Sequence, residues 1–106
     1  MATVRVAIRN QSGVPLTSID GTAFLTLLTR DGSVIDQQEV SLFHADAIFS
    51  FLDLGDYTML VRHPAVKPSE VGENFTISGK QDVLSVYFYY DEPKRRFSHA
   101  RVQRAG

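Results

Sequence analysis

A stretch of fifteen residues in the middle of the chain constrains its fold more than any other segment. Residues 47–61 read AIFSFLDLGDYTMLV, which is two runs of alternating apolar residues on either side of a glycine. Alternation with period two is typical of a half-buried strand, and a glycine between two such runs favours a tight turn. We therefore predict a β-hairpin that supplies one core with the side chains of Phe49, Phe51, Leu54, Tyr57, Met59 and Val61.

Strand patterns continue through the first ninety residues. The Asp31-Gly32 pair is typical of a hairpin turn, and the polar run 33–42 that follows it is typical of an edge strand. Within residues 1–90, no segment of ten or more residues has a convincing helical stripe. Besides the two arms of the central hairpin, strands are expected at residues 3–9, 22–29, 33–42, 74–78 and 82–90. About seven short strands at hairpin spacing favour an all-β fold, a seven-stranded antiparallel Greek-key sandwich.

The charge of the chain is unevenly distributed. Residues 1–90 hold six basic and ten acidic residues, a balance of −4, whereas residues 91–106 hold five basic and two acidic residues, a balance of +3. We therefore expect a sandwich domain at 1–90 and a short basic C-terminal tail at 91–106, which docks on an acidic protein partner or on its own body. Nucleic acid is not the expected partner, because the overall pI of about 6.3 is low for such a protein.

The tail has a helical rather than a strand pattern. Pro93 ends the last strand or opens a short helix, and Phe97 shares a helical face with Ala100 and Arg101. Deleting residues 91–106 is therefore expected to abolish partner binding or oligomerisation and to leave the fold intact.

Two tyrosines form the second candidate contact surface. Tyr87 and Tyr89 lie on the face of the last strand opposite its core stripe. Exposed aromatic rings two residues apart can contact a partner protein or stack on a sugar ring. The alternative is a second packed face under the tail, with Phe97 covering a tyrosine, and the residues alone leave both open.

The sequence shows no constellation typical of an enzyme or a metal site. There is no cysteine, so disulfides and thiolate ligands are excluded. The histidines, at positions 44, 63 and 99, are far apart and are interpreted as solvated loop or tail residues. Asp53 and Asp56 flank Leu54-Gly55 and are interpreted as turn formers. We expect no catalytic activity, no metal and no cofactor.

The order of turn and core motifs resembles a known family. The motifs are Val4-x-Val6, Gly13-Val14-Pro15-Leu16, Ala23-x-Leu25-x-Leu27, Asp31-Gly32, Phe49-x-Phe51-x-x-Leu54-Gly55-x-Tyr57-x-Met59-x-Val61 and His63-Pro64-Ala65-Val66. Over residues 3–90 they resemble prealbumin-like sandwiches of the carboxypeptidase-regulatory-like and collagen-adhesin B-type repeats. The resemblance implies a prealbumin- or immunoglobulin-like fold and is almost silent on function, because such modules serve as spacers, stalks and binding domains.

The chain departs from that family at two points, and each departure argues against one chemical activity known in the family. The first strand carries Arg5 and Arg9 in place of the lysine that forms an isopeptide bond in adhesin repeats, so no internal cross-link is expected. The related hydroxyisourate hydrolases end in Tyr-Arg-Gly-Ser, whereas this chain ends in Arg104-Ala105-Gly106, so that activity is not expected either.

The sequence thus favours a non-enzymatic protein-interaction or assembly module that uses a sheet edge, exposed tyrosines and a basic tail. The alternative is a carbohydrate- or ligand-binding accessory domain. A membrane is not an expected partner, since no run of about 18 apolar residues occurs. If Met1 is the native start, a cytoplasmic location is expected. The candidate partner-binding residues are Tyr87, Tyr89, Lys94, Arg95, Arg96, Phe97, Arg101 and Arg104.

Overall fold

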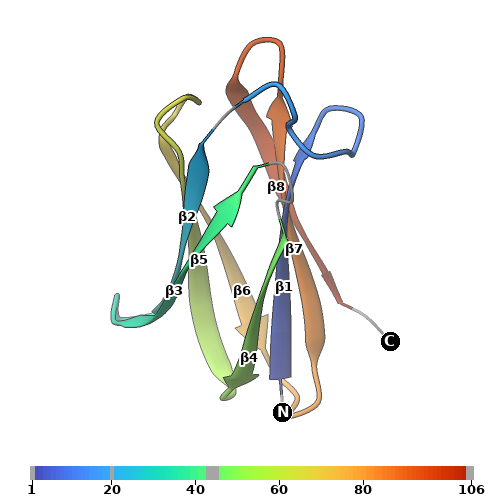
Figure 1. Ribbon diagram of the computed structural model, residues 1–106. Coiled ribbons are helices and arrows are strands. Elements are labelled where there is room, and N and C mark those ends of the chain that lie inside the picture. Colours follow the sequence, from blue (N-terminus) through green and yellow to red (C-terminus); the bar gives the residue numbers. More distant parts are fainter. Residues whose placement is uncertain (1, 20, 43–45, 105–106) are drawn as a thin grey trace.

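The protein is a β-sandwich of two four-stranded sheets (Figure 1). The computed structural model describes residues 2–19, 21–42 and 46–104. The strands are β1 (Ala2–Asn10), β2 (Thr22–Thr29), β3 (Val34–Ser41), β4 (Asp46–Leu52), β5 (Gly55–Arg62), β6 (Glu70–Ile77), β7 (Val83–Asp91) and β8 (Arg96–Arg104). Sheet A has the order β4-β1-β7-β8 and sheet B the order β3-β2-β5-β6. No helix in the described ranges is long and apolar enough to cross a membrane.

The core fills the space between the two sheets, as the alternating patterns predict. Most inward-facing residues of the central strands are at most 2% exposed, because every second side chain of a strand points to the same face. On β1 and β7 these residues are Val4, Val6, Ile8, Leu84, Val86, Phe88 and Tyr90. On β2 and β5 they include Leu25, Leu27, Met59 and Val61.

The hairpin between β2 and β3 is confirmed. Gly32 adopts a φ of 89°, a left-handed conformation that a glycine accepts without steric cost. The amide of Thr29 donates to the carbonyl of Ser33 at 2.9 Å and closes the turn. β3 is the outermost strand of sheet B, so the predicted edge position of the polar run 33–42 is also confirmed.

The expected number and direction of the strands need correction. The described residues form eight strands rather than seven, and the sandwich is not purely antiparallel. β1 and β7 run parallel, from Thr3 opposite Val83 to Asn10 opposite Tyr90. Strand direction across such a pair depends on how the chain crosses between the sheets, and hydrophobic alternation is the same in either direction.

The extra strand comes from the segment that was expected to be a basic, partly helical tail. Residues 96–104 form β8, which pairs antiparallel with β7, so the expected helical face of Phe97 and Arg101 is wrong. The β7 edge offers backbone partners to this segment, and Phe97 and Ala100 pack against the core from it. Tertiary pairing here overrides a weak local helical preference, since short helices are marginal alone.

The central hairpin is confirmed as β4 and β5, but two of its six predicted core residues face solvent. Phe51 is 76% exposed and Leu54, in the turn, is 52% exposed. The register between β1 and β4 shifts between Val4–Phe49 and Ala2–Leu52, which is a β-bulge, and Phe51 has a φ of 63°. A bulge inserts one residue into a strand and turns its side chain to the other face, which strict alternation does not foresee.

Candidate functional site

The outward face of sheet A brings together the largest set of predicted contact residues. Tyr87 and Tyr89 point outward from β7 because their neighbours Val86 and Phe88 point into the core. The register of β7 with its two neighbours places further residues on the same outward face. We call this set the Tyr–Arg face; it consists of Arg5, Arg9, Tyr87, Tyr89, His99 and Arg101.

Three aromatic rings on the Tyr–Arg face stack on one another. The ring centroids of Tyr89 and His99 are 4.8 Å apart with an interplanar angle of 19°, and those of Tyr87 and Tyr89 are 6.0 Å apart at 20°. Nearly parallel rings at 4.8 Å must overlap face to face, because coplanar rings cannot approach so closely. His99 therefore covers one face of the Tyr89 ring, and that ring face is not open for a sugar to stack on.

Arginine side chains border the rings and make this face basic. Asp46 of β4 accepts hydrogen bonds from Arg5 at 3.0 Å and from Arg9 at 2.7 Å. Partial burial raises the pKa of Asp46, but the hydrogen bonds from Arg9 and Arg5 outweigh it and hold the pKa below its ordinary value. With Arg101 added, the face has more guanidinium than carboxylate groups, because Asp46 balances only one of them.

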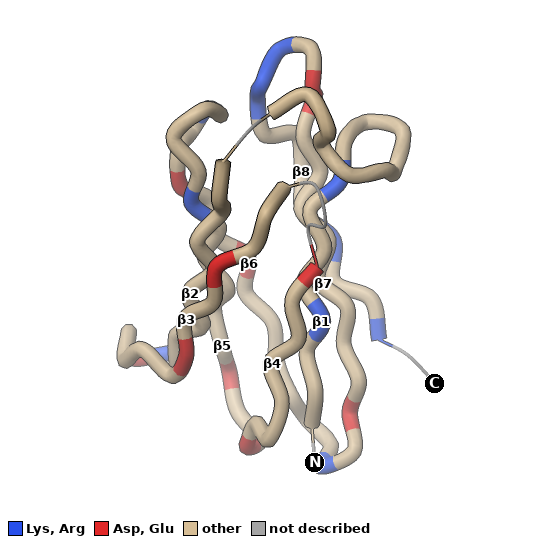
Figure 2. Tube along the Cα trace, viewed as in Figure 1, with Lys and Arg blue, Asp and Glu red and all other residues tan. Residues whose placement is uncertain are grey.

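The structure divides the predicted partner-binding residues among three places. Tyr87, Tyr89 and Arg101 share the Tyr–Arg face. The basic run 94–96 lies at the β7–β8 turn, which is among the basic segments at the top of Figure 2. The amide of Lys67 donates to the carbonyl of Arg95 at 2.9 Å, so this turn is attached to the loop before β6.

The other two predicted contact residues have structural partners. Phe97 points inward, with its ring 5.4 Å from Tyr90 and 6.4 Å from Phe88, so it does not cover Tyr87 or Tyr89. Arg104 forms an ion pair with Asp82 and donates to the carbonyl of Thr76 at 3.3 Å. The hydrogen bond from Arg104, together with bonds from Gly79 and Ser78, lowers the pKa of Asp82.

Three members of the Tyr–Arg face were not among the predicted contact residues. His99 was interpreted as a solvated tail residue, and Arg5 and Arg9 were considered only as replacements for a lysine. Their position beside the tyrosines depends on the pairing of β7 with β1 and β8. The available signal was that Arg5 and Arg9 are the two charged residues on the outward face of the first strand.

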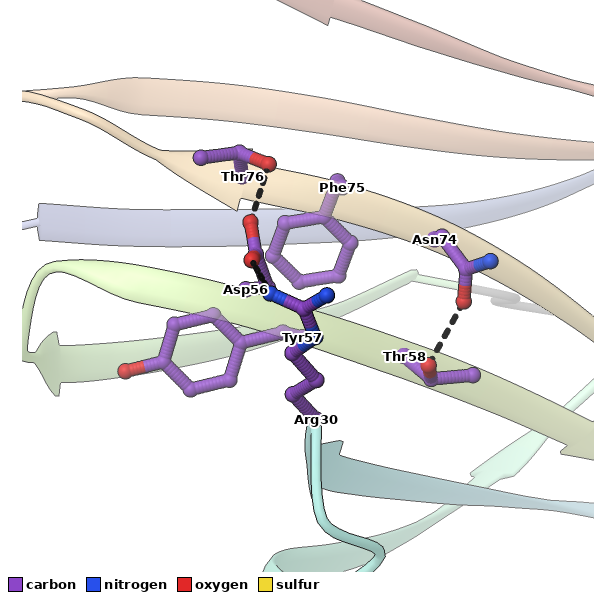
Figure 3. A pocket seen from close by; sticks show the side chains of 7 residues that line it. All are labelled: Arg30, Asp56, Tyr57, Thr58, Asn74, Phe75 and Thr76. Atoms are coloured by element: carbon purple, nitrogen blue, oxygen red, sulfur yellow. Dashed lines mark hydrogen bonds and ion pairs between the residues drawn. The ribbon is translucent and has the colours of Figure 1, made fainter.

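The outward face of sheet B has a shallow hollow of about 380 Å³ (Figure 3). Its polar side chains already bind one another. Thr58 donates to Asn74 at 2.6 Å, and Thr76 donates to Asp56 at 2.6 Å. Asp56 also accepts from Arg30 at 3.3 Å. These hydrogen bonds join side chains of β5 and β6. Because the polar groups of the hollow are already bonded to one another, we interpret it as part of the sheet's structure and not as a binding site.

The histidines have separate environments. His63 is only 3% exposed and its Nδ1 accepts a hydrogen bond from the amide of Ala65 at 3.0 Å, so its interpretation as a solvated loop residue is wrong. His99 stacks on Tyr89 at the surface. His44 lies outside the described residues. Among the described residues, no three His, Asp or Glu side chains gather as a metal site requires.

Comparisons of this chain with protein-family models, with curated proteins and with solved structures found no match.

Proposed function

We propose that the protein is a non-enzymatic interaction module that binds an acidic surface of a protein chain through its Tyr–Arg face and β8. The observation that carries this proposal is the juxtaposition of Tyr87, Tyr89, His99 and Arg101 on one outward face, beside Arg5 and Arg9. Tyrosine and arginine are enriched where proteins contact one another, because each combines apolar area with hydrogen-bond donors.

The charge of the site selects an acidic partner. Arg101 donates only to Gln103, at 3.2 Å, among the hydrogen bonds shown for its side chain, and no carboxylate forms an ion pair with it in the described residues. Lys94 and Arg95, in the turn before β8, and Arg96, its first residue, extend the positive charge. A carboxylate of a partner therefore meets a guanidinium that can form a bidentate pair.

The resemblance to prealbumin-like repeats, and with it the Greek-key topology, remains part of this proposal. A binding role agrees with that resemblance but does not depend on it, because function belongs to the site and not to the fold. The alternative, a carbohydrate-binding accessory domain using Tyr87 and Tyr89, is less well supported because His99 occupies one face of the Tyr89 ring.

The test is a titration of the whole protein with a fluorescently labelled oligoglutamate peptide, followed by anisotropy. Binding is expected at low salt and is expected to weaken as salt rises, since exposed charges are screened. Arg101→Glu should weaken binding by about tenfold or more. Lys80→Glu, the same charge change in the exposed turn before β7, is the matched control and should weaken it far less.

Three results would contradict the proposal. The first is equal binding by the Arg101→Glu and Lys80→Glu variants, because binding would then follow net charge alone. The second is tighter binding of an oligothymidylate carrying the same charge, which would indicate a nucleic-acid site. The third is binding of a neutral oligosaccharide that is lost in a Tyr87→Ser/Tyr89→Ser variant, which would support the alternative.

A further inference from the structure

The two most exposed strands of the molecule lie on opposite sides of the sandwich. β3 is the last strand of sheet B and lies beside β4, where the side chain of Gln38 donates to the carbonyl of Ile48 at 2.8 Å. β8 is the last strand of sheet A and lies beside β6, where Arg104 donates to Thr76. Since β4 and β8 are the two opposite edges of sheet A, β3 and β8 face away from each other.

Both strands leave apolar side chains exposed. Val34 and Ile35 of β3 are 57% and 43% exposed, and Val102 of β8 is 38% exposed. In the described part of the chain no strand pairs with the free edge of β3, and on the free edge of β8 the only bridge is between Lys67 and Arg96. A free edge presents unpaired backbone donors and acceptors to another strand.

The charges of the two edges are opposite and unmixed. β3 holds two carboxylates, Asp36 and Glu39, and no basic residue, whereas β8 holds three arginines and no carboxylate. Acidic positions along β3 are visible in Figure 2. Edges that carry charges of one sign repel each other. Pairing of β3 with another β3, or of β8 with another β8, is therefore disfavoured.

Each of the two edges carries a charged side chain on its outward face. Asp36 and Glu39 are three residues apart, as are Arg101 and Arg104. Three-residue spacing places the members of each pair on opposite faces of their strand. Glu39 lies opposite Phe24 on the outward face of sheet B, and Arg101 lies opposite Tyr87 on the outward face of sheet A.

The other members of the two pairs, Asp36 and Arg104, face the interior of the sandwich. Asp36 lies opposite the buried Leu27, and Arg104 lies opposite the buried Leu84. Within one copy β3 and β8 run in opposite directions (Figure 1). When the two edges meet with their outward faces continuous, the second copy is turned end over end, so the two strands run parallel. A register that places Glu39 beside Arg101 then places Asp36 beside Ser98 and not beside Arg104. Arg104 is already paired with Asp82 within its own chain, so the Glu39–Arg101 pair contributes most of the selectivity.

We propose that the acidic surface bound by β8 is the β3 edge of a second copy of this chain. The inference rests on the proposed function and names its partner. β3 has eight residues and β8 has nine, so the two edges are of matching length for β-augmentation. Because the two surfaces differ and lie on opposite sides, the contact is head-to-tail and adds further copies instead of closing at a dimer.

The test is sedimentation velocity of the whole protein over a range of concentrations at low and high salt. The wild-type chain should form species larger than a dimer, and high salt should dissociate them. Glu39→Arg and Arg101→Glu should each weaken association by about tenfold or more. The Glu39→Arg/Arg101→Glu double variant restores opposite charges on the two edges and should associate like the wild type.

Matched controls use the same charge changes away from both edges. Asp53→Arg and Lys80→Glu lie in exposed turns and should leave association unchanged. Circular dichroism should show strand content equal to the wild type for every variant, since all four positions lie at the surface.

Each contrary result has a distinct meaning. A wild-type chain that stays monomeric at every concentration overturns the inference, and it leaves the proposed function standing if the monomer still binds oligoglutamate through Arg101. If Arg101→Glu weakens association and Glu39→Arg does not, only the role of β3 is overturned. A closed dimer, or a double variant that is not restored, overturns the head-to-tail pairing.

Discussion

The ring of Phe97 meets the ring of Tyr90 edge to face, with centroids 5.4 Å apart and an interplanar angle of 68°. Tyr90 is 2% exposed and belongs to the inner face of β7, whereas Phe97 is the second residue of β8. This contact joins the C-terminal strand to the core of the sandwich. The segment that carries the proposed binding residues therefore also contributes to stability.

Phe97→Ala should destabilise the protein by about 2 kcal/mol, less than the 3–5 kcal/mol typical of a fully buried phenylalanine, because Phe97 is only partly buried. Chemical denaturation of the variant measures this loss. Phe97→Leu, which keeps most of the apolar volume, is the control and should lose less. A variant as stable as the wild type would show that β8 does not pack on the core.

Removal of residues 91–106 should also destabilise the sandwich, in contrast to the expectation from sequence that the fold stays intact. The deletion uncovers the edge of β7 and one side of Phe88 and Tyr90. Thermal unfolding should show a lower Tm for the truncated chain, and a Tm equal to that of the full chain would refute the structural role of β8. Point substitutions are therefore better probes of binding than truncation.

Phe51→Gly should leave stability unchanged or raise it by up to about 1 kcal/mol. Phe51 is 76% exposed and has a φ of 63°, so its replacement loses little packing and relieves a conformation that costs bulky L-residues about 1–2 kcal/mol. Phe49→Ala, two residues earlier and 1% exposed, should instead cost about 3–5 kcal/mol. Equal losses at both positions in denaturant unfolding would contradict the bulge in β4.

Gly21→Ala should be more destabilising than Gly13→Ala. Both glycines have a left-handed φ, 107° and 82°, so an alanine at either position is strained. A Cβ at Gly21 would also lie 3.1 Å from Nε2 of the buried His63, whereas at Gly13 it would meet nothing within 4 Å. Comparison of the two Tm values isolates the contact with His63, and identical Tm values would argue against it.

Glu92 should make the protein less stable in acid. Hydrogen bonds from Ser18 and then Asn10 lower the pKa of Glu92 below its ordinary value of 4.5. A carboxyl with a lowered folded pKa stabilises the fold above the unfolded pKa, and this contribution is lost as pH falls through the folded pKa. Tm should therefore fall below about pH 4.5.

The matched variants separate Glu92 from the other carboxylates. Glu92→Gln should lower Tm by a few degrees at neutral pH and should make Tm less dependent on pH in the acid range, since the charge that titrates is gone. Glu70→Gln, at an exposed position of β6, should resemble the wild type in both respects. A Glu92→Gln variant with an unaltered acid profile would contradict the assigned role.

Tyr90 should be the last tyrosine to ionise. Burial raises the pKa of Tyr90 from its ordinary value of 10.0 to about 12. The neutral phenol therefore stabilises the fold fully below pH 10, and that contribution is lost as pH rises toward 12. Tyr90→Phe should remove the highest-pH step from the phenolate absorbance titration and leave the lower steps unchanged. Loss of a lower step instead would show that Tyr90 is accessible.

Most strand positions follow from local pattern. The runs around β1, β2, β3 and β7 were predicted within about one residue of their observed bounds, because alternation and turn residues act over a few neighbours. β6 is an exception: it was expected at residues 74–78, whereas it begins at Glu70, because pairing with β5 extends it past its apolar pattern. The bulge at Phe51 and the strand character of residues 96–104 also depend on a neighbouring strand.

The candidate site, too, follows partly from the sequence and partly from the tertiary structure. The outward position of Tyr87 and Tyr89 and the excess of basic residues after position 90 are properties of the sequence itself, since they follow from period-two alternation and from counting charges. Only the tertiary structure placed His99 on Tyr89, Arg101 beside Tyr87, and Arg5 and Arg9 on the same face. Local pattern determines which way a side chain points from its strand, whereas pairing between distant segments decides which side chains become neighbours.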